Sequence, residues 1–190
     1  ELIDWDNYQD DPIFNLTFPN RDMLRPEHFS EMENVLNSTN DRNVIRETAY
    51  KIRLQLNPHP AGQVELNVPE IDGVKLTGIQ HKYRETLLFF PSSGQTCHSY
   101  CTFCFRWPQF VGMNEIKFAM RETELLVKYL EKHQEVTDIL FTGGDPMIMK
   151  FKVFQQYIEP FLKKNNTNIQ SIRIGTKSLG FWPYKFTDDE

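Results

Sequence analysis

The second half of this 190-residue chain alternates between short apolar runs and stretches with helical periodicity. The apolar runs are Leu87-Leu88-Phe89-Phe90, residues 138–142 and residues 169–174, as expected of strands that are buried on both faces. Between them, residues 118–133 and 151–163 place their apolar side chains on one helical face. Because strand and helix alternate, we predict a parallel sheet with right-handed crossovers and hence an α/β fold.

The first 80 residues have a different character. Residues 1–24 carry aromatic and acidic side chains, and we predict irregular structure there. Pro26 suits the first turn of a helix, and a second helical pattern ends near Leu56, before a stretch that contains Pro and Gly. We therefore expect two parts: an irregular and helical extension at residues 1–80, and the α/β part at residues 81–190.

The chain has three cysteines, and all lie in one window, Cys97-His98-Ser99-Tyr100-Cys101-Thr102-Phe103-Cys104. An odd, clustered set argues against a disulfide framework and favours metal binding in a reducing cytosol. Three thiolates on one loop can hold an iron–sulfur cluster and leave one iron open to an external ligand. Two alternatives stay open: a zinc site with His98, His81 or a distant His as the fourth ligand, and three structural cysteines.

Candidate functional segments follow each of the three predicted strands. The cysteine window comes after the first, Gly143-Gly144-Asp145-Pro146 after the second, and Arg173 to Lys177 at the end of the third. Ligands of α/β folds bind outside the carboxyl ends of the parallel strands. We therefore expect the three segments to line one rim of the sheet.

The cysteine window, with an aromatic residue before its last cysteine, resembles that of the radical S-adenosylmethionine (SAM) enzymes. The resemblance implies a partial radical SAM (β/α) barrel and a 4Fe–4S cluster that cleaves SAM reductively to a 5′-deoxyadenosyl radical. The implied metal ligands are Cys97, Cys101 and Cys104. The Gly-Gly-Asp-Pro sequence resembles the family's glycine-rich loop after the second strand. The implied SAM-binding residues are Phe103, Gly143, Gly144 and Asp145.

Residues 81–180 resemble the lysine 2,3-aminomutase family more specifically, through the segments Cys97 to Arg106, Thr142 to Pro146, Arg173 to Lys177 and His81 to Tyr83. That family moves an amino group between adjacent carbons with SAM and pyridoxal 5′-phosphate (PLP). The resemblance implies that Arg106 binds the substrate α-carboxylate, a role suited to a guanidinium fork. Lys82 and Thr86 fall where the family has arginines near the PLP phosphate, and Arg173 is implied in cofactor binding.

The resemblance leaves the substrate and the use of PLP open. The family's PLP-binding lysine lies beyond the third strand, and three strands are fewer than a complete barrel needs. We therefore expect residues 1–190 alone to lack aminomutase turnover. Two alternatives remain: a PLP-free radical SAM enzyme that acts on another substrate, such as a peptidyl one, and a non-catalytic metal-binding or interaction fragment.

The composition of the chain excludes some classes of binding partner. The net charge of −5 and the pI near 5.6 argue against a nucleic-acid partner. No apolar run approaches the ~20 residues that span a bilayer, and the acidic, polar N-terminus does not resemble a signal peptide. We expect a cytoplasmic protein that binds a small amino-acid substrate, with the aromatic N-terminal segment as a candidate homo-oligomer contact.

Overall fold

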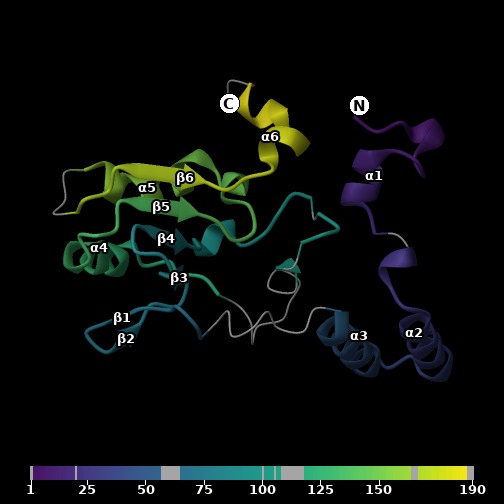
Figure 1. Ribbon diagram of the computed structural model, residues 1–190. Helices are drawn as coiled ribbons and strands as arrows, with labels where there is room; N and C mark the ends of the chain where they lie inside the picture. The colour runs from purple at the N-terminus through teal and green to yellow at the C-terminus, as the bar shows by residue number, and fades with distance from the viewer. Residues whose placement is uncertain are drawn as a thin grey trace. The chain divides into compact units, whose positions relative to one another are not determined.

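The computed structural model describes residues 2–19, 21–56, 65–99, 101–104, 106–107, 118–163 and 167–187. The chain divides into two units (Figure 1). The first contains Glu1–Ala61 and Tyr100–Pro108, and the second contains Gly62–Ser99 and Gln109–Glu190. This division differs from the boundary expected at residue 80. The physical reason is that Ile71, Leu76 and Ile79 are buried in the core of the second unit.

A four-stranded sheet forms the centre of the second unit, in the order β3-β4-β5-β6. The strands span Ile79–Gln80 (β3), Thr86–Phe89 (β4), Asp138–Phe141 (β5) and Ser171–Ile174 (β6). The strands β4, β5 and β6 are parallel, whereas β3 is antiparallel to β4. The helix α4 (Thr123–Lys132) connects β4 to β5, and α5 (Phe151–Leu162) connects β5 to β6. The predicted α/β arrangement is confirmed; its extension to a partial barrel stays a prediction.

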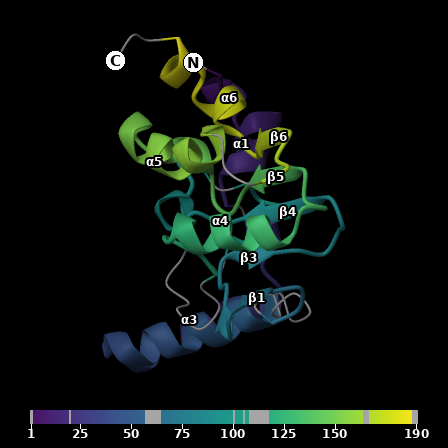
Figure 2. The same ribbon diagram turned by 90° about the vertical axis from the view of Figure 1, so that its left-hand side faces the viewer.

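The helices α4 and α5 pack on the same side of this sheet (Figure 2). The four strand residues that join them in the core are Leu87, Phe89, Ile139 and Phe141, none of which exposes any side-chain surface. Alternate strand residues point to opposite faces. Leu88 and Leu140 therefore lie on the other face, where they are half-buried.

The helix predicted from residue 118 begins five residues later, at Thr123. Phe118 and Met120 are buried in an extended segment, and Met120 exchanges backbone hydrogen bonds of 2.9 Å with Phe90 and Ser92. Their apolar side chains are therefore part of the core although the backbone here is extended. Helical periodicity alone cannot distinguish such a segment from the first turn of a helix.

The remaining elements of the second unit are short. A hairpin of β1 (Glu70–Ile71) and β2 (Val74–Lys75) turns through Asp72 and Gly73, whose φ angles are 51° and 78°. After β6, the short helix α6 (Ser178–Phe181) is followed by a 3-10 turn at Pro183–Phe186.

The first unit is helical. It contains α1 (Pro12–Thr17), α2 (Pro26–Ser38) and α3 (Arg42–Leu56), with 3-10 turns at Trp5–Asn7 and Arg21–Met23. The two helices predicted after residue 25 are confirmed. A buried His28 joins them, with its Nε2 3.1 Å from the Gln55 side-chain oxygen. None of the helices in the described ranges is both long and apolar enough to cross a bilayer.

The prediction of irregular structure for residues 1–24 is wrong at α1. The Asp11 carboxylate accepts hydrogen bonds of 2.8 Å from the backbone N–H groups of Ile13 and Phe14, and Pro12 occupies the first helical position. Both features stabilise a helix start. Phe14 stacks on Phe18, with ring centroids 4.7 Å apart, so the aromatic residues pack on one another here.

Candidate functional site

The segment that leads into Cys97 packs directly against the glycine-rich loop. The backbone N–H of Asp145 donates a hydrogen bond of 2.7 Å to the Thr96 carbonyl. The Gln95 side-chain amide donates to the carbonyls of Pro91, at 3.0 Å, and Thr142, at 3.5 Å. Since β4 and β5 are adjacent and parallel, the loops after them meet at one edge, as predicted for this pair.

Two glycines permit this close approach. Gly143 has a φ of 128°, a conformation that residues with a Cβ rarely adopt. A Cβ on Gly143 would overlap the Gln95 side-chain amide, and a Cβ on Gly144 would overlap the backbone of Thr96. The loop therefore requires glycine at both positions to lie against the residues before Cys97.

The buried Asp145 side chain hydrogen-bonds to several residues of the rim. It is 2% exposed, and its carboxylate accepts hydrogen bonds from the residues that follow β6. The donors are the Thr176 hydroxyl (2.7 and 2.9 Å), the Lys177 N–H (2.9 Å), the Ser178 N–H (3.2 Å) and the Ser178 hydroxyl (3.1 Å). The Met147 N–H donates at 2.9 Å. These contacts hold the loops after β5 and β6 together, so the carboxylate has a structural role, and its predicted contact with SAM stays a prediction.

Arg173 does not lie with the rim residues. Its guanidinium forms a bidentate ion pair with the Asp138 carboxylate, including an Nε–Oδ1 distance of 2.8 Å. Asp138 is the first residue of β5 and is in register with Ser171, two positions before Arg173 on the same face of the sheet. The side chain of Arg173 therefore reaches back toward the amino ends of the strands. The guanidinium holds the pKa of Asp138 below its usual value.

Lys82 also lies away from the rim. It precedes β4, is exposed, and places its Nζ 5.4 Å from the centroid of the Tyr83 ring. Thr86, at the other position implied for the PLP phosphate, donates a hydrogen bond of 3.0 Å to Asp138. Lys82 and Thr86 therefore lie at the amino ends of the strands, whereas the rim lies at their carboxyl ends.

His98, which follows Cys97, has an unusual environment. Its ring contacts Phe181 and Trp182, with ring centroids at 6.0 and 6.1 Å. Both ring nitrogens are buried, and neither has a hydrogen-bond partner within the described residues. A buried polar group without a partner costs about 1–3 kcal/mol. The side chain is therefore placed where a bound group could satisfy it.

The rest of the cysteine window belongs to the first unit. The backbone N–H of Thr102 donates to the Leu16 carbonyl at 2.8 Å, and that of Cys104 donates to the Cys101 carbonyl at 3.0 Å. The Phe103 side chain points to solvent, 66% exposed. Burial lowers the pKa of Arg106 to about 10, and a negative charge on Cys104 opposes this shift. Tyr100 lies outside the described residues.

The chemistry of the donor set fits a thiolate-bound metal centre. Cys97, Cys101 and Cys104 form no disulfide and are half-buried, and thiolates are the usual ligands of iron–sulfur clusters. Among the described residues, no three His, Cys, Asp or Glu side chains are arranged closely enough to hold a metal ion. The identity and spacing of the ligands, rather than a preformed cage, support the predicted site.

No protein-family model matches this sequence. Comparison with curated proteins finds L-lysine 2,3-aminomutase of Haemophilus influenzae, 31% identical over 111 residues, which are 58% of this chain and 31% of that protein. L-lysine 2,3-aminomutase of Fusobacterium nucleatum is 25% identical over 166 residues, 87% of this chain and 37% of the relative. Glutamate 2,3-aminomutase of Clostridioides difficile is 27% identical over 95 residues, 49% of this chain and 21% of the relative.

The chain is related to the lysine 2,3-aminomutases. The resemblance predicted from the cysteine window and the glycine-rich loop is thereby confirmed. The matched part of this aminomutase-like chain spans 31% and 37% of the two lysine 2,3-aminomutases, about a third of their length.

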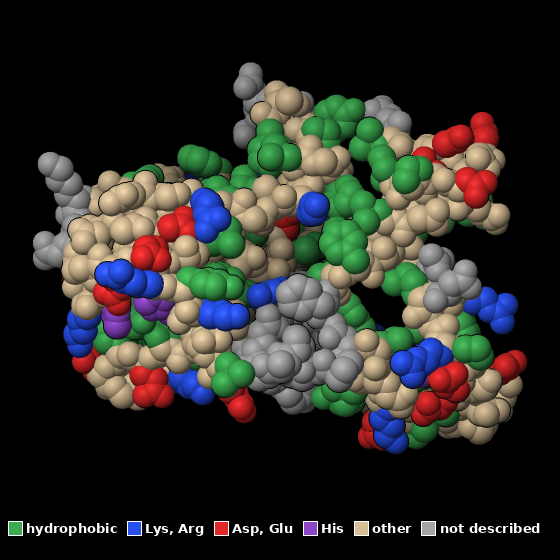
Figure 3. All heavy atoms as spheres, in the orientation of Figure 1, with side chains coloured by type: hydrophobic (Ala, Val, Ile, Leu, Met, Phe, Trp, Pro, Cys, Tyr) green, Lys and Arg blue, Asp and Glu red, His purple; other side chains and the backbone are tan. Residues whose placement is uncertain are grey.

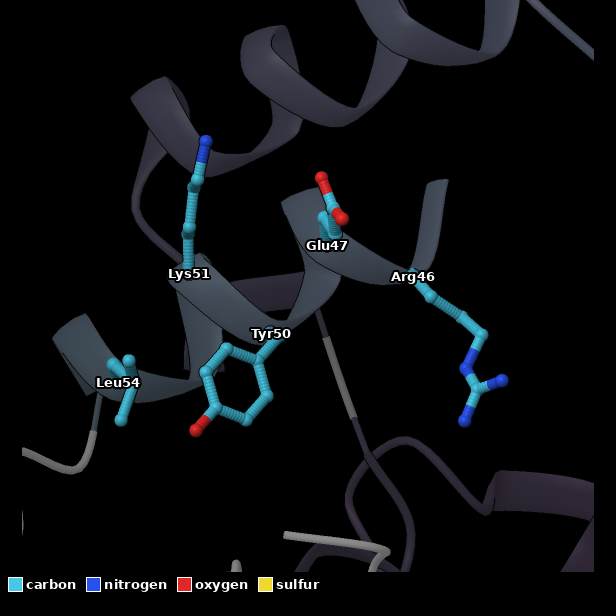
Figure 4. Close-up of a pocket in the computed structure, with 5 residues that line it drawn as sticks. All are labelled: Arg46, Glu47, Tyr50, Lys51 and Leu54. Carbon is cyan, nitrogen blue, oxygen red and sulfur yellow. The ribbon is translucent and has the colours of Figure 1, made fainter. Parts of the chain in front are cut away.

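Two pockets have lining residues other than those of the rim. One, of about 400 Å³, runs along α3 of the first unit. Figure 4 shows its lining side chains, Arg46, Glu47, Tyr50, Lys51 and Leu54, extending from this one helix. The other, of about 390 Å³, lies by the start of α4 and is lined by residues that include Ser93, Arg121 and Tyr157. Neither contains a residue of the cysteine window or the glycine-rich loop.

Three residues that support the rim were not predicted from the sequence. Gln95 and Thr96 hydrogen-bond to the glycine-rich loop, and Ser178 binds Asp145 together with Thr176, which lies in the predicted segment Arg173 to Lys177. All are common polar residues in loops, where no periodicity or spacing marks them. Their positions directly before Cys97 and directly after β6 are the one signal that could have indicated them.

Proposed function

We propose that this chain is part of a radical SAM enzyme of the 2,3-aminomutase type. The observation that carries the proposal is the attachment of the glycine-rich loop to the residues before Cys97, in a chain related to the aminomutases. This attachment brings the backbone of Gly143 and Gly144 next to the first predicted cluster ligand. The proposed cytoplasmic location rests on the reduced, metal-binding role of the cysteines.

In this proposal, Cys97, Cys101 and Cys104 hold a 4Fe–4S cluster, and SAM occupies the iron that they leave open. Together these two cofactors supply the radical that abstracts hydrogen from the substrate. The glycines allow the loop to pack against the residues before Cys97, and in this proposal the backbone of the loop is then close to the bound SAM. The exposed ring of Phe103 supplies an apolar surface for SAM.

Arg106 is the proposed ligand of the substrate carboxylate. Even with its pKa lowered to about 10, the guanidinium is protonated at neutral pH. Partial burial strengthens an ion pair with a carboxylate, and the planar fork can bind both oxygens. The relatives are named for lysine and for glutamate, which share the α-carboxylate and differ in their side chains. We therefore propose an α-amino acid substrate, lysine or a related one, with PLP as the carrier of the migrating amino group.

The cluster can be tested in the purified protein by anaerobic reconstitution with iron and sulfide. We expect broad absorption from thiolate-to-iron charge transfer and bound iron and sulfide in equal amounts. A Cys101→Ala variant should lose both. Thr102→Ser, in the same window, is the matched control and should reconstitute normally. Purified protein that contains tetrahedral zinc and takes up no iron would contradict the proposal.

Amino-group migration needs a separate test. We expect residues 1–190 to bind the cluster without converting lysine to a β-amino acid, because the implied PLP-binding lysine lies beyond this segment. Product analysis by mass spectrometry after incubation with SAM, PLP and a reductant measures this directly. Formation of a β-amino acid by residues 1–190 would contradict the assignment of that lysine outside the segment.

A further inference from the structure

The imidazole of His98 occupies a fixed position beside the first cysteine of the window. Its ring contacts Phe181 at the end of α6 and the following Trp182. Both ring nitrogens are shielded from solvent and have no hydrogen-bond partner in the part of the chain that the structure describes. A neutral imidazole always carries one N–H donor. The described residues around His98 therefore pack against its ring and accept no hydrogen bond from its N–H group.

The elements on both sides of this imidazole are held by the same residue. Asp145 binds the Ser178 N–H and hydroxyl, which fixes the start of α6 and hence the helix that carries Phe181. The Asp145 N–H also binds the Thr96 carbonyl, two residues before His98. Because these contacts share Asp145, the orientation of the His98 ring is coupled to the glycine-rich loop.

Packing alone does not explain a histidine at this position. A phenylalanine ring would contact Phe181 and Trp182 equally well and would bury no polar atom. A histidine at position 98 is explained if the protein with its cofactors bound contains a hydrogen-bond acceptor beside the ring. The nearest acceptors that the proposed function adds are the sulfur atoms of a cluster bound through Cys97. Hydrogen bonds to cluster sulfurs stabilise the more negative, reduced state and so raise the reduction potential.

We propose that His98 donates an N–H hydrogen bond to a sulfur of the cluster bound at Cys97 and thereby raises its reduction potential. This inference rests on the proposed function, because it needs the cluster. It makes His98 a positioning residue that tunes the cluster and does not ligate it.

The test is the midpoint potential of the reconstituted cluster in wild-type protein and in His98→Phe, measured by a redox titration that is followed by electron paramagnetic resonance. His98→Phe keeps the aromatic packing and removes the donor, so we expect a shift to more negative potential at unchanged iron content. His98→Asn and His98→Gln place an amide N–H near the positions of Nδ1 and Nε2, and one of them should reverse part of the shift. His133→Phe, a histidine of the same unit that pairs with Glu135, is the control and should leave the potential unchanged.

The other outcomes separate this inference from the proposed function. Equal potentials in wild type and His98→Phe, with full cluster content, would overturn the inference and leave the proposed function intact. Loss of one iron in His98→Phe alone would also overturn it, since His98 would then be a ligand. Failure of the wild-type protein to take up iron would overturn the proposed function and the inference with it.

Discussion

The Asp145 carboxylate accepts hydrogen bonds from both the N–H and the hydroxyl of Ser178, at 3.2 and 3.1 Å, across 33 residues of sequence. The contact joins the loop after β5 to the first residue of α6. Because Asp145 also binds Thr96 through its own N–H, it connects the loops that follow all three parallel strands. The candidate site therefore depends on one buried carboxylate that was expected to bind a cofactor.

Replacing this carboxylate should destabilise the protein strongly. Asp145→Asn places an amide group opposite the N–H groups of Lys177 and Ser178 and leaves buried donors unpaired, so we expect a loss of about 3 kcal/mol in the free energy of unfolding. Urea denaturation followed by circular dichroism measures the change. Asp72→Asn is the control, because Asp72 is exposed and its ion pair with Lys132 is screened by solvent. Equal effects of the two substitutions would contradict the anchoring role.

Adding a methyl group to Gly144 should separate the glycine-rich loop from the cysteine window. Its Cβ would overlap the Thr96 backbone, so we expect Gly144→Ala to lose about 1–3 kcal/mol of stability. Gly180→Ala is the matched control, because a Cβ there meets no atom within 4 Å. In α6 that change should be neutral or stabilise by up to about 1 kcal/mol. Thermal unfolding of the two variants gives the comparison, and a neutral Gly144→Ala would refute the close packing.

Arg173→Gln should affect stability and leave cluster loading unchanged. The guanidinium binds Asp138 at the amino ends of the strands, and an ion pair this exposed is weakened by solvent screening, so the loss of stability should be small. A double-mutant cycle with Asp138→Asn measures the coupling. Loss of bound iron in Arg173→Gln would instead favour the cofactor-binding role implied by the family resemblance.

The same ion pair predicts a pH dependence. The folded-state pKa of Asp138 lies below its unfolded value, mainly because Arg173 donates hydrogen bonds to it. Its stabilising contribution is therefore present above the unfolded pKa of about 4 and is lost as the pH falls through the folded value. Unfolding measured from pH 7 downward should show the wild type and Asp138→Asn converging below pH 4. A constant difference would indicate that Asp138 acts through its shape and not its charge.

Tyr129 should ionise at unusually high pH. Its hydroxyl lies 2.7 Å from His81 Nδ1, and burial, with a smaller contribution from Glu135, raises its pKa above the usual 10. Histidine side chains gather near α4 (Figure 3), where the ring centroids of His81 and His133 lie 5.9 Å apart. Since the folded pKa exceeds the unfolded one, this contribution to stability is present below pH 10 and is lost as the pH rises further.

Ultraviolet difference titration of wild type against Tyr129→Phe measures that pKa. At neutral pH the substitution should cost about 1 kcal/mol, because it removes the hydrogen bond to His81. Tyr83→Phe, at an exposed position, is the control and should change the stability little. A Tyr129 phenol that titrates at or below the usual pKa of about 10 would contradict the burial argument.

Some helices and strands lie where the sequence pattern predicts them, and others do not. The strands β4, β5 and β6 lie where the apolar runs predict them. Burial on both faces is not found, because β4 and β5 alternate between buried and half-buried residues and β6 is mostly exposed. The start of α4 does not follow the pattern, since Phe118 and Met120 fill the core from an extended segment. The helix α1 forms where aromatic and acidic composition suggested none, because Asp11 caps it.

The sequence by itself determined the parallel order of β4, β5 and β6, the family relationship, and the identity of the cysteine and glycine residues of the candidate site. These features depend on periodicity and on spacing along the chain. Only the tertiary structure decided where the polar side chains point. Arg173 follows the rim in sequence yet reaches back to Asp138, and Asp145 turns inward to bind Ser178. The physical reason is that a charged side chain, whether buried as Asp145 is or exposed as Arg173 is, pairs with the donors or counter-charges that the fold brings within hydrogen-bond distance, and those partners are distant in sequence.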